Sequence, residues 1–119
     1  MIEAQYMIAE ASLAGGTGGM SSTQIVALID ARRAVGGMAA YSGATTTAAL
    51  RSELLDQRKR DFYFAGYRVG DLRRYKKLYS TDFWPKGVMP GLTETYGADE
   101  CWPMDVNELN GNPNARAGG

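Results

Sequence analysis

Residues 57–74 read QRKRDFYFAGYRVGDLRR, and this stretch decides how the chain is expected to fold. It lies within the longest helical pattern of the sequence, which begins near Thr46 or Thr47. Apolar residues at helical spacing mark one stripe of that pattern: Leu50, Leu54, Leu55, Phe62, Ala65, Val69 and Leu72. Because Gly66 and Gly70 interrupt the pattern, we expect a bend or break there, followed by a short helix from about Asp71 to Lys77.

Charged residues fall on the apolar side of this stretch. Arg58 follows Leu54 by four residues and precedes Phe62 by four, so it shares their helix face. An unpaired charge there would cost several kcal/mol, and the planar guanidinium of arginine can hold two carboxylate oxygens at once. The sequence therefore predicts an interior ion-pair network formed by Arg58, Asp61, Arg68, Asp71 and Arg74. The network can act as a lock at the bend or as a sugar or anion site; paired side chains favour the lock.

Two further helices are expected before this stretch. The first runs from about Ile2 to Leu13 and ends at the glycine-rich segment 15–19. The second begins at Ser21, where Gln24 completes a capping box, and Gly36 and Gly37 stop it. Helices joined in pairs by short loops predict an all-α fold with tetratricopeptide-like helix pairs.

Helical periodicity fades from Leu78 onward, where four prolines break the chain. We expect residues 1–77 to form a helical scaffold and residues 78–119 to form an irregular tail packed on it, within the same domain. A short helix is predicted from about Asp105 to Leu109. Residues 51–77 hold nine basic and four acidic residues, whereas residues 78–119 hold two basic and six acidic residues, so charge complementarity favours this docking.

The composition argues against several classes of function. The chain has no histidine and one cysteine, Cys101, so the commonest general base, an internal disulfide and a thiolate metal cluster are all excluded. We therefore expect no enzyme activity, no catalytic residue, no metal and no cofactor. Thirteen basic residues balance thirteen acidic ones, which argues against a nucleic-acid partner. No stretch approaches the roughly 20 apolar residues of a transmembrane helix, and residues 1–13 lack the features of a signal peptide.

Aromatic residues in the tail are the candidates for ligand contact. Trp84, Tyr96 and Trp102 lie in irregular sequence, where binding residues are common. They can stack on the apolar face of a sugar ring, or they can anchor the tail to the helices; the second interpretation is the more ordinary one.

Four ordered blocks of the sequence resemble the SusD/RagB family. Residues 58–74 are similar to its "ERR-E-FEG-R-DL-R" block, and residues 101–114 to its closing "hPIP…EI…NPN" segment. Residues 6–11 and 25–33 are similar to its "ilAEA" and "iN-iR-R" helices. The chain departs from the pattern at Gln57 and Ala65, where the family usually has glutamate, and at Met104, where it usually has isoleucine.

The resemblance implies an α-helical lipoprotein at the cell surface, anchored in the outer membrane. Such a protein captures oligosaccharides and passes them to a TonB-dependent transporter of the SusC type. Family members are several times longer, so the resemblance implies that this chain is a fragment, without a lipobox of its own. We expect a glycan- or nutrient-binding subunit without catalysis. The alternative is a helical-repeat module for protein–protein interaction that binds no sugar.

Overall fold

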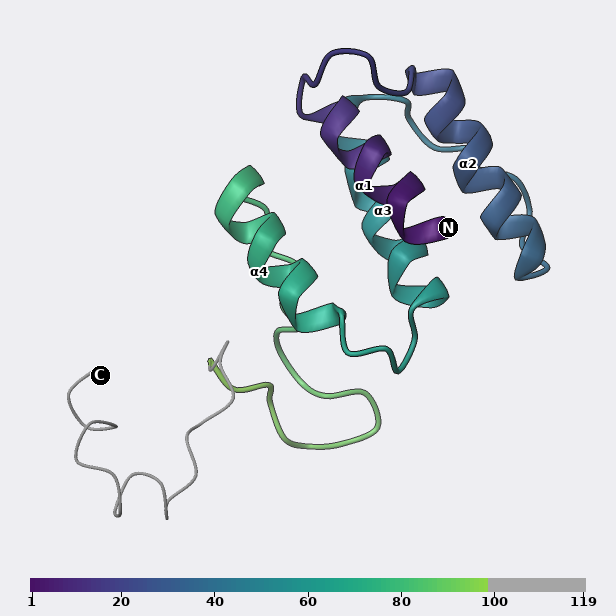
Figure 1. Cartoon of the computed structure of the whole chain (residues 1–119). Coiled ribbons are helices and arrows are strands. Elements are labelled where there is room, and N and C mark those ends of the chain that lie inside the picture. The colour runs from purple at the N-terminus through teal and green to yellow at the C-terminus, as the bar shows by residue number, and fades with distance from the viewer. Residues whose placement is uncertain (99–119) are drawn as a thin grey trace. The chain divides into compact units, whose positions relative to one another are not determined.

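The computed structural model describes residues 1–98 of the 119-residue chain and contains four helices in that part. They are α1 (Ile2–Leu13), α2 (Ser22–Val35), α3 (Thr47–Asp61) and α4 (Arg68–Tyr79), as Figure 1 shows. Within residues 1–98 no β-strand forms; one isolated antiparallel bridge joins Val88 and Thr95. The prediction of an all-α fold is confirmed.

Side-chain caps start α2 and α3 where the sequence predicts. The Gln24 backbone N–H donates to Ser21 Oγ, and the Ser21 N–H donates to Gln24 Oε1, so the capping box is complete. Thr46 accepts from the Ala49 N–H at the start of α3. Gly37 ends α2 with φ +67°, a conformation that favours glycine, and the next N–H returns to Arg33 O at 2.9 Å. Local sequence alone therefore determines these helix ends.

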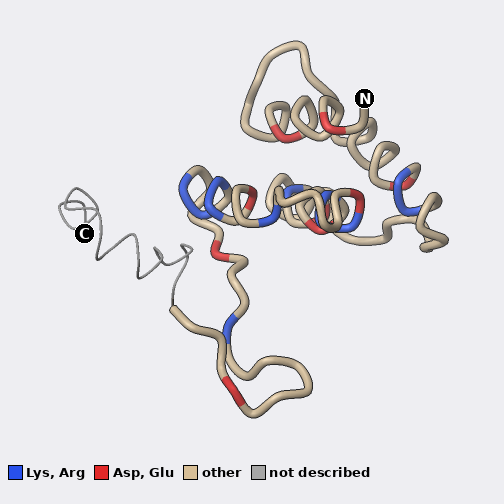
Figure 2. The backbone as a smooth tube through the Cα atoms, turned by 60° about the horizontal axis from the view of Figure 1, so that its bottom comes forward, with Lys and Arg blue, Asp and Glu red and all other residues tan. Residues whose placement is uncertain are grey.

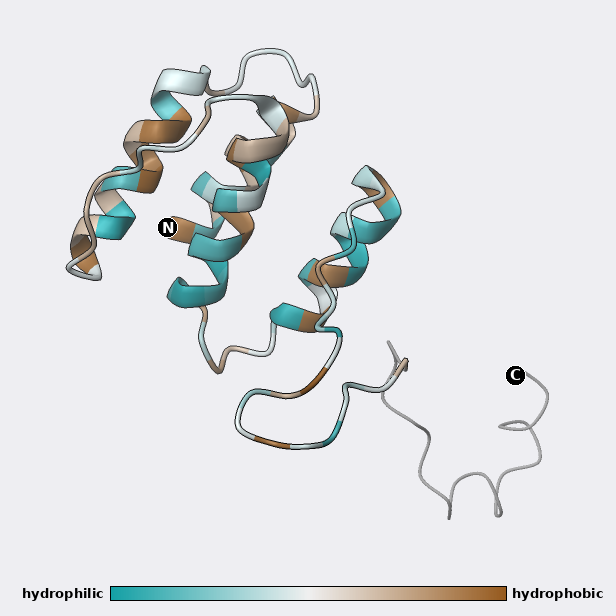
Figure 3. Ribbon diagram, turned by 180° about the vertical axis from the view of Figure 1, so that it is seen from behind, coloured by the Kyte–Doolittle hydropathy of each residue, from teal (hydrophilic) through white to brown (hydrophobic). Residues whose placement is uncertain are grey.

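The chain forms two compact units, Met1–Asp71 and Leu72–Gly119, and each is described by itself. In the first unit, α1 and α2 both pack against α3. Their apolar faces meet in one buried cluster, in which no side chain is more than 2% exposed: Tyr6, Ala9, Ile25, Ile29, Leu50 and Leu54. Figure 3 shows hydrophilic and apolar residues mixed along α2 and α3, as expected for helices with one face in a core.

The break after the third helix lies earlier than predicted. α3 ends at Asp61, a turn spans residues 62–67, and α4 begins at Arg68. The turn requires left-handed backbone at Phe64 (φ +65°) and Gly66 (φ +79°), and only the second suits its residue. Gly70 therefore lies inside α4, where glycine costs only about 1 kcal/mol. Ala65 and Val69, predicted on the apolar stripe of one long helix, are exposed instead.

Residues 80–98 are irregular, as predicted for the tail. Pro90 and Gly91 (φ +79°) occupy the corners of a tight turn that the Leu92 N–H closes on Met89 O at 3.0 Å. Hydrogen bonds from Met89 N to Glu94 O and from Tyr96 N to Gly87 O hold the two arms of this turn together. The helix predicted near residues 105–109, Cys101 and Trp102 lie outside the described residues.

Candidate functional site

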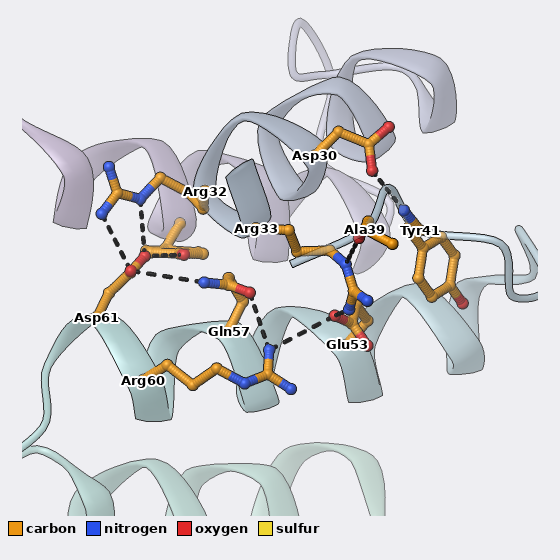
Figure 4. Close-up of polar contacts among 10 residues, drawn as sticks. Asp30, Arg32, Arg33, Ala39, Tyr41, Glu53, Gln57, Arg60 and Asp61 are labelled. Carbon is orange, nitrogen blue, oxygen red and sulfur yellow. Dashed lines mark hydrogen bonds and ion pairs between the residues drawn. The ribbon is translucent and has the colours of Figure 1, made fainter. Parts of the chain in front are cut away.

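Asp61, at the end of α3, accepts hydrogen bonds from three other residues of the first unit (Figure 4). Arg32 of α2 binds it with two parallel contacts, Nε to Oδ2 and Nη2 to Oδ1, both at 3.0 Å. The hydroxyl of Tyr6, from α1, donates to Oδ2, and Gln57 Nε2 lies 3.5 Å from Oδ1. One carboxylate therefore joins α1, α2 and α3, in the paired geometry that makes arginine–carboxylate contacts strong.

The protonation of these groups reflects their burial and pairing. Burial opposes the ionisation of Asp61, but the hydrogen bonds from Arg32 and Tyr6 outweigh it and hold the pKa of its carboxyl below the ordinary value. Burial raises the pKa of the Tyr6 phenol, and the hydrogen bond to Asp61 raises it further. The hydrogen bond to Asp61 likewise raises the pKa of Arg32. Each group therefore keeps the protonation state that its hydrogen bonds require across neutral pH.

Polar contacts continue along α3 toward its first turn. Arg60 donates to Gln57 Oε1 at 2.8 Å and lies 3.7 Å from Glu53. Glu53 also pairs with Arg33 of α2 at 2.7 Å, and Arg33 Nε in turn binds the backbone oxygen of Ala39. These contacts hold α2 and the loop after it against α3.

A second cluster surrounds Arg58, which is 6% exposed. Its Nε lies 2.8 Å from Asp71 Oδ2, and its Nη2 lies 3.4 Å from Glu3 Oε1. The guanidinium carbon also lies 5.0 Å from the ring centre of Phe62 and 5.4 Å from that of Tyr67. Two carboxylates and two aromatic rings therefore surround this cation, which is a stabilising environment for a buried arginine.

The structure distributes the five predicted network residues over several places. Arg58 and Asp71 lie together, whereas Asp61 pairs with Arg32. Nη1 of Arg68 is buried without a hydrogen-bond partner in the described part of the chain. Arg74 lies in the second unit, with its guanidinium carbon 5.6 Å from the ring centre of Tyr75.

Sequence reasoning missed three partners in these clusters: Glu3, Tyr6 and Arg32. Arg32 carried a usable signal, because it follows Ile25 by seven residues and Ile29 by three, on the apolar face of α2. A charge on that face needs a partner. Its partner could not be read locally, since Asp61 lies 29 residues further along the chain.

The second unit contains a hollow of about 350 Å³, with Trp84 and Tyr96 among its lining residues. Asp82 and Lys86, also in the lining, form an ion pair at 2.8 Å. The hydrogen bond from Lys86, and a weaker one from the Trp84 backbone N–H, hold the pKa of Asp82 below its ordinary value. Nε1 of Trp84 is buried and has no hydrogen-bond partner among the residues described. Trp102, the third predicted stacking residue, lies outside the described residues.

A search of residues 1–98 for groups of three or more His, Cys, Asp and Glu side chains that could bind a metal found none. In the same part of the chain, no helix is both long enough and apolar enough to cross a bilayer.

Lysine and arginine gather on α3 and α4, whereas α1 carries only acidic charges, Glu3 and Glu10 (Figure 2).

Comparison with known proteins gives one match. A family model described as the SusD family matches residues 3–115, nearly the whole chain. No curated protein and no solved structure matches the sequence. Members of this family are binding proteins associated with nutrient uptake at the outer membrane, where they work with SusC transporters. The extent of the match, together with the helical fold, shows that the chain belongs to the SusD family.

Proposed function

We propose that the chain is a glycan- or nutrient-binding part of a SusC/SusD-type outer-membrane uptake system and carries out no catalysis. Its site is the hollow of the second unit, and its ligand is an oligosaccharide delivered to a SusC-type transporter. Family membership supports the general role. The single observation that carries the site is the Trp84 indole N–H: it is buried, it has no acceptor among residues 1–98, and Trp84 lines a hollow together with Tyr96.

The chemistry of this hollow suits a sugar. An aromatic ring offers an apolar surface on which the C–H face of a pyranose can stack, and an indole N–H can donate to a hydroxyl. A buried donor without an acceptor costs about 1–3 kcal/mol, so a ligand hydroxyl that accepts from Trp84 recovers this energy. Asp82 and Lys86 supply an acceptor and a donor for further hydroxyls at the same hollow.

Titration calorimetry with a panel of neutral oligosaccharides tests the proposal. The full chain should bind one member saturably, and Trp84→Ala should weaken binding at least about tenfold, because both stacking and the N–H are lost. Trp84→Phe keeps a ring but removes the donor and should weaken binding about three- to tenfold. Leu92→Ala, an exposed substitution in the same segment outside the lining, is the control and should bind as the parent chain does.

Two results would overturn the proposal. One is failure of every oligosaccharide to bind; the other is equal binding by the parent chain and Trp84→Ala. If a SusC-type transporter also fails to co-purify while other helical proteins do, the interaction-module alternative gains support.

A further inference from the structure

A second hollow, of about 360 Å³, lies in the first unit at the turn between α3 and α4. Its walls are largely aromatic: Phe62, Tyr63, Phe64 and Tyr67 all line it. Phe62 and Tyr67 pack edge to face, with ring centres 5.2 Å apart, which fixes one wall. Tyr63 and Phe64 are 74% and 92% exposed, and their ring centres lie 4.5 Å apart. The hollow thus offers flat apolar surfaces of the kind on which sugar rings stack.

The charge of this hollow is positive. Arg58, Lys59 and Arg68 line it, against one carboxylate, Asp71. Oδ2 of that carboxylate already binds Arg58 at 2.8 Å, and a single carboxylate does not balance three cations. Arg68 Nη1 is shielded from water and has no hydrogen-bond partner in the described part of the chain. A charged donor that lacks both water and an acceptor is costly, so the hollow favours an anionic ligand.

We propose that this hollow binds a carboxylated sugar ring, a uronic acid unit of an acidic oligosaccharide. The ring stacks on the exposed aromatic side chains, and the carboxylate accepts hydrogen bonds from Arg68. A carboxylate suits the guanidinium because its two oxygens match two parallel N–H groups. The inference rests on the proposed function, since it names an acidic class of glycan and gives it a binding site separate from the Trp84 hollow.

Titration calorimetry with trigalacturonate and with its methyl ester tests the inference directly. The ester has the same rings but no charge. The full chain should bind the acid at low salt and bind the ester at least about tenfold more weakly, a difference of about 1.4 kcal/mol. Raising the salt concentration should weaken binding of the acid and leave that of the ester unchanged. Equal binding of acid and ester, or no saturable binding of the acid, would overturn the inference.

Matched variants test whether Arg68 binds the carboxylate of the ligand. Arg68→Gln should weaken binding of the acid at least about tenfold and leave binding of the ester unchanged. Lys59→Gln removes the same charge from an exposed side chain of the same hollow and should cost less than about threefold. Phe64→Ala, at a ring that is 92% exposed, should preserve the fold and weaken binding of both ligands. If Arg68→Gln and Lys59→Gln have the same effect, Arg68 is not the anchor and the assignment is wrong.

Two further measurements distinguish the proposed site from a simple anion site and from the Trp84 hollow. Inorganic phosphate that displaces trigalacturonate at equal concentration would show a simple anion site and overturn the role of the ring. Neutral oligosaccharides that depend on Trp84, with no binding of the acid, would leave the proposed function standing and reject this inference alone. Loss of both neutral and acidic binding would reject both.

Discussion

Two clusters of the first unit each contain an arginine, and the two arginines differ in their hydrogen bonding. In the cluster around Asp61, Arg32 makes two hydrogen bonds to one carboxylate, which Tyr6 also binds. In the hollow at the α3–α4 turn, Arg68 has a buried nitrogen without any acceptor in residues 1–98. In the first arrangement, both oxygens of the carboxylate already accept hydrogen bonds from the protein. A paired charge thus holds helices together in the first cluster, whereas the unpartnered nitrogen of Arg68 supports the proposal that an anionic ligand binds in the second.

The largest expected effect is on stability and concerns the ion pair between Arg58 and Asp71. Arg58→Ala should lower the free energy of unfolding by about 3–5 kcal/mol, because Asp71, only 3% exposed, then loses its ion pair with Arg58. Asp71→Ala should lower the free energy of unfolding by a similar amount, since Arg58 then loses its contact with the carboxylate of Asp71. Urea unfolding followed by circular dichroism measures both. Lys59→Ala, at the neighbouring exposed position, should change stability by less than about 0.5 kcal/mol. An unchanged free energy of unfolding for Arg58→Ala would show that the Arg58 guanidinium is exposed to solvent.

Asp61→Asn should have the next largest effect, a loss of about 2–3 kcal/mol at neutral pH. Asparagine keeps one of the two acceptor oxygens, so the two parallel contacts with Arg32 cannot both form, and the guanidinium loses the negative charge of Asp61. Chemical denaturation at pH 7 provides the measurement, and Asp56→Asn, at an exposed position of the same helix, is the control. Equal stability of the two variants would contradict the role of Asp61 in joining the three helices.

The same contribution should depend on pH. The pKa of Asp61 is lower in the folded protein than its ordinary value of 3.8, so the unfolded chain binds a proton more readily as the pH falls. The stability from Asp61 is therefore fully present above about pH 5 and is lost as the pH falls through the lower, folded-state pKa. The stability difference between the parent chain and Asp61→Asn should shrink across this acid range. A constant difference down to about pH 2 would refute the pairing.

Tyr6→Phe should cost less, about 1 kcal/mol, because it removes one hydrogen bond and leaves the ring in the core. The penalty should largely disappear in the Asp61→Asn background, since the acceptor is then altered. A double-mutant cycle measures this coupling. Strict additivity of the two substitutions would show that the hydroxyl and the carboxylate do not interact.

The smallest effect on stability is expected at Arg68, the arginine with an unpartnered nitrogen in residues 1–98. Arg68→Gln should change the free energy of unfolding by less than about 0.5 kcal/mol or raise it slightly, because it removes a buried charged donor that has no acceptor within residues 1–98. Thermal unfolding of the ligand-free chain measures the change. A loss above about 1 kcal/mol would show that Arg68 is paired, and the contrast between the two arginine clusters would then fail.

The sequence by itself determined the features that depend on near neighbours. Ser21 with Gln24, Thr46, and the glycines at positions 36 and 37 set helix ends through hydrogen bonds that span three to five residues, so no distant contact is needed to predict them. The ordered family blocks likewise sufficed to predict an all-α fold and the SusD family, which the match over residues 3–115 confirms.

Only the tertiary structure decided which charges meet. Asp61 finds its arginine 29 residues earlier in the chain and its tyrosine 55 residues earlier, because packing of α1 and α2 on α3 brings these side chains together. The same applies to Glu3 and Arg58 and to the position of the break, where the turn at residues 62–67 takes precedence over the pattern of one long helix. Ion pairing depends on distance in space, to which spacing along the sequence gives no guide once the chain has folded back on itself.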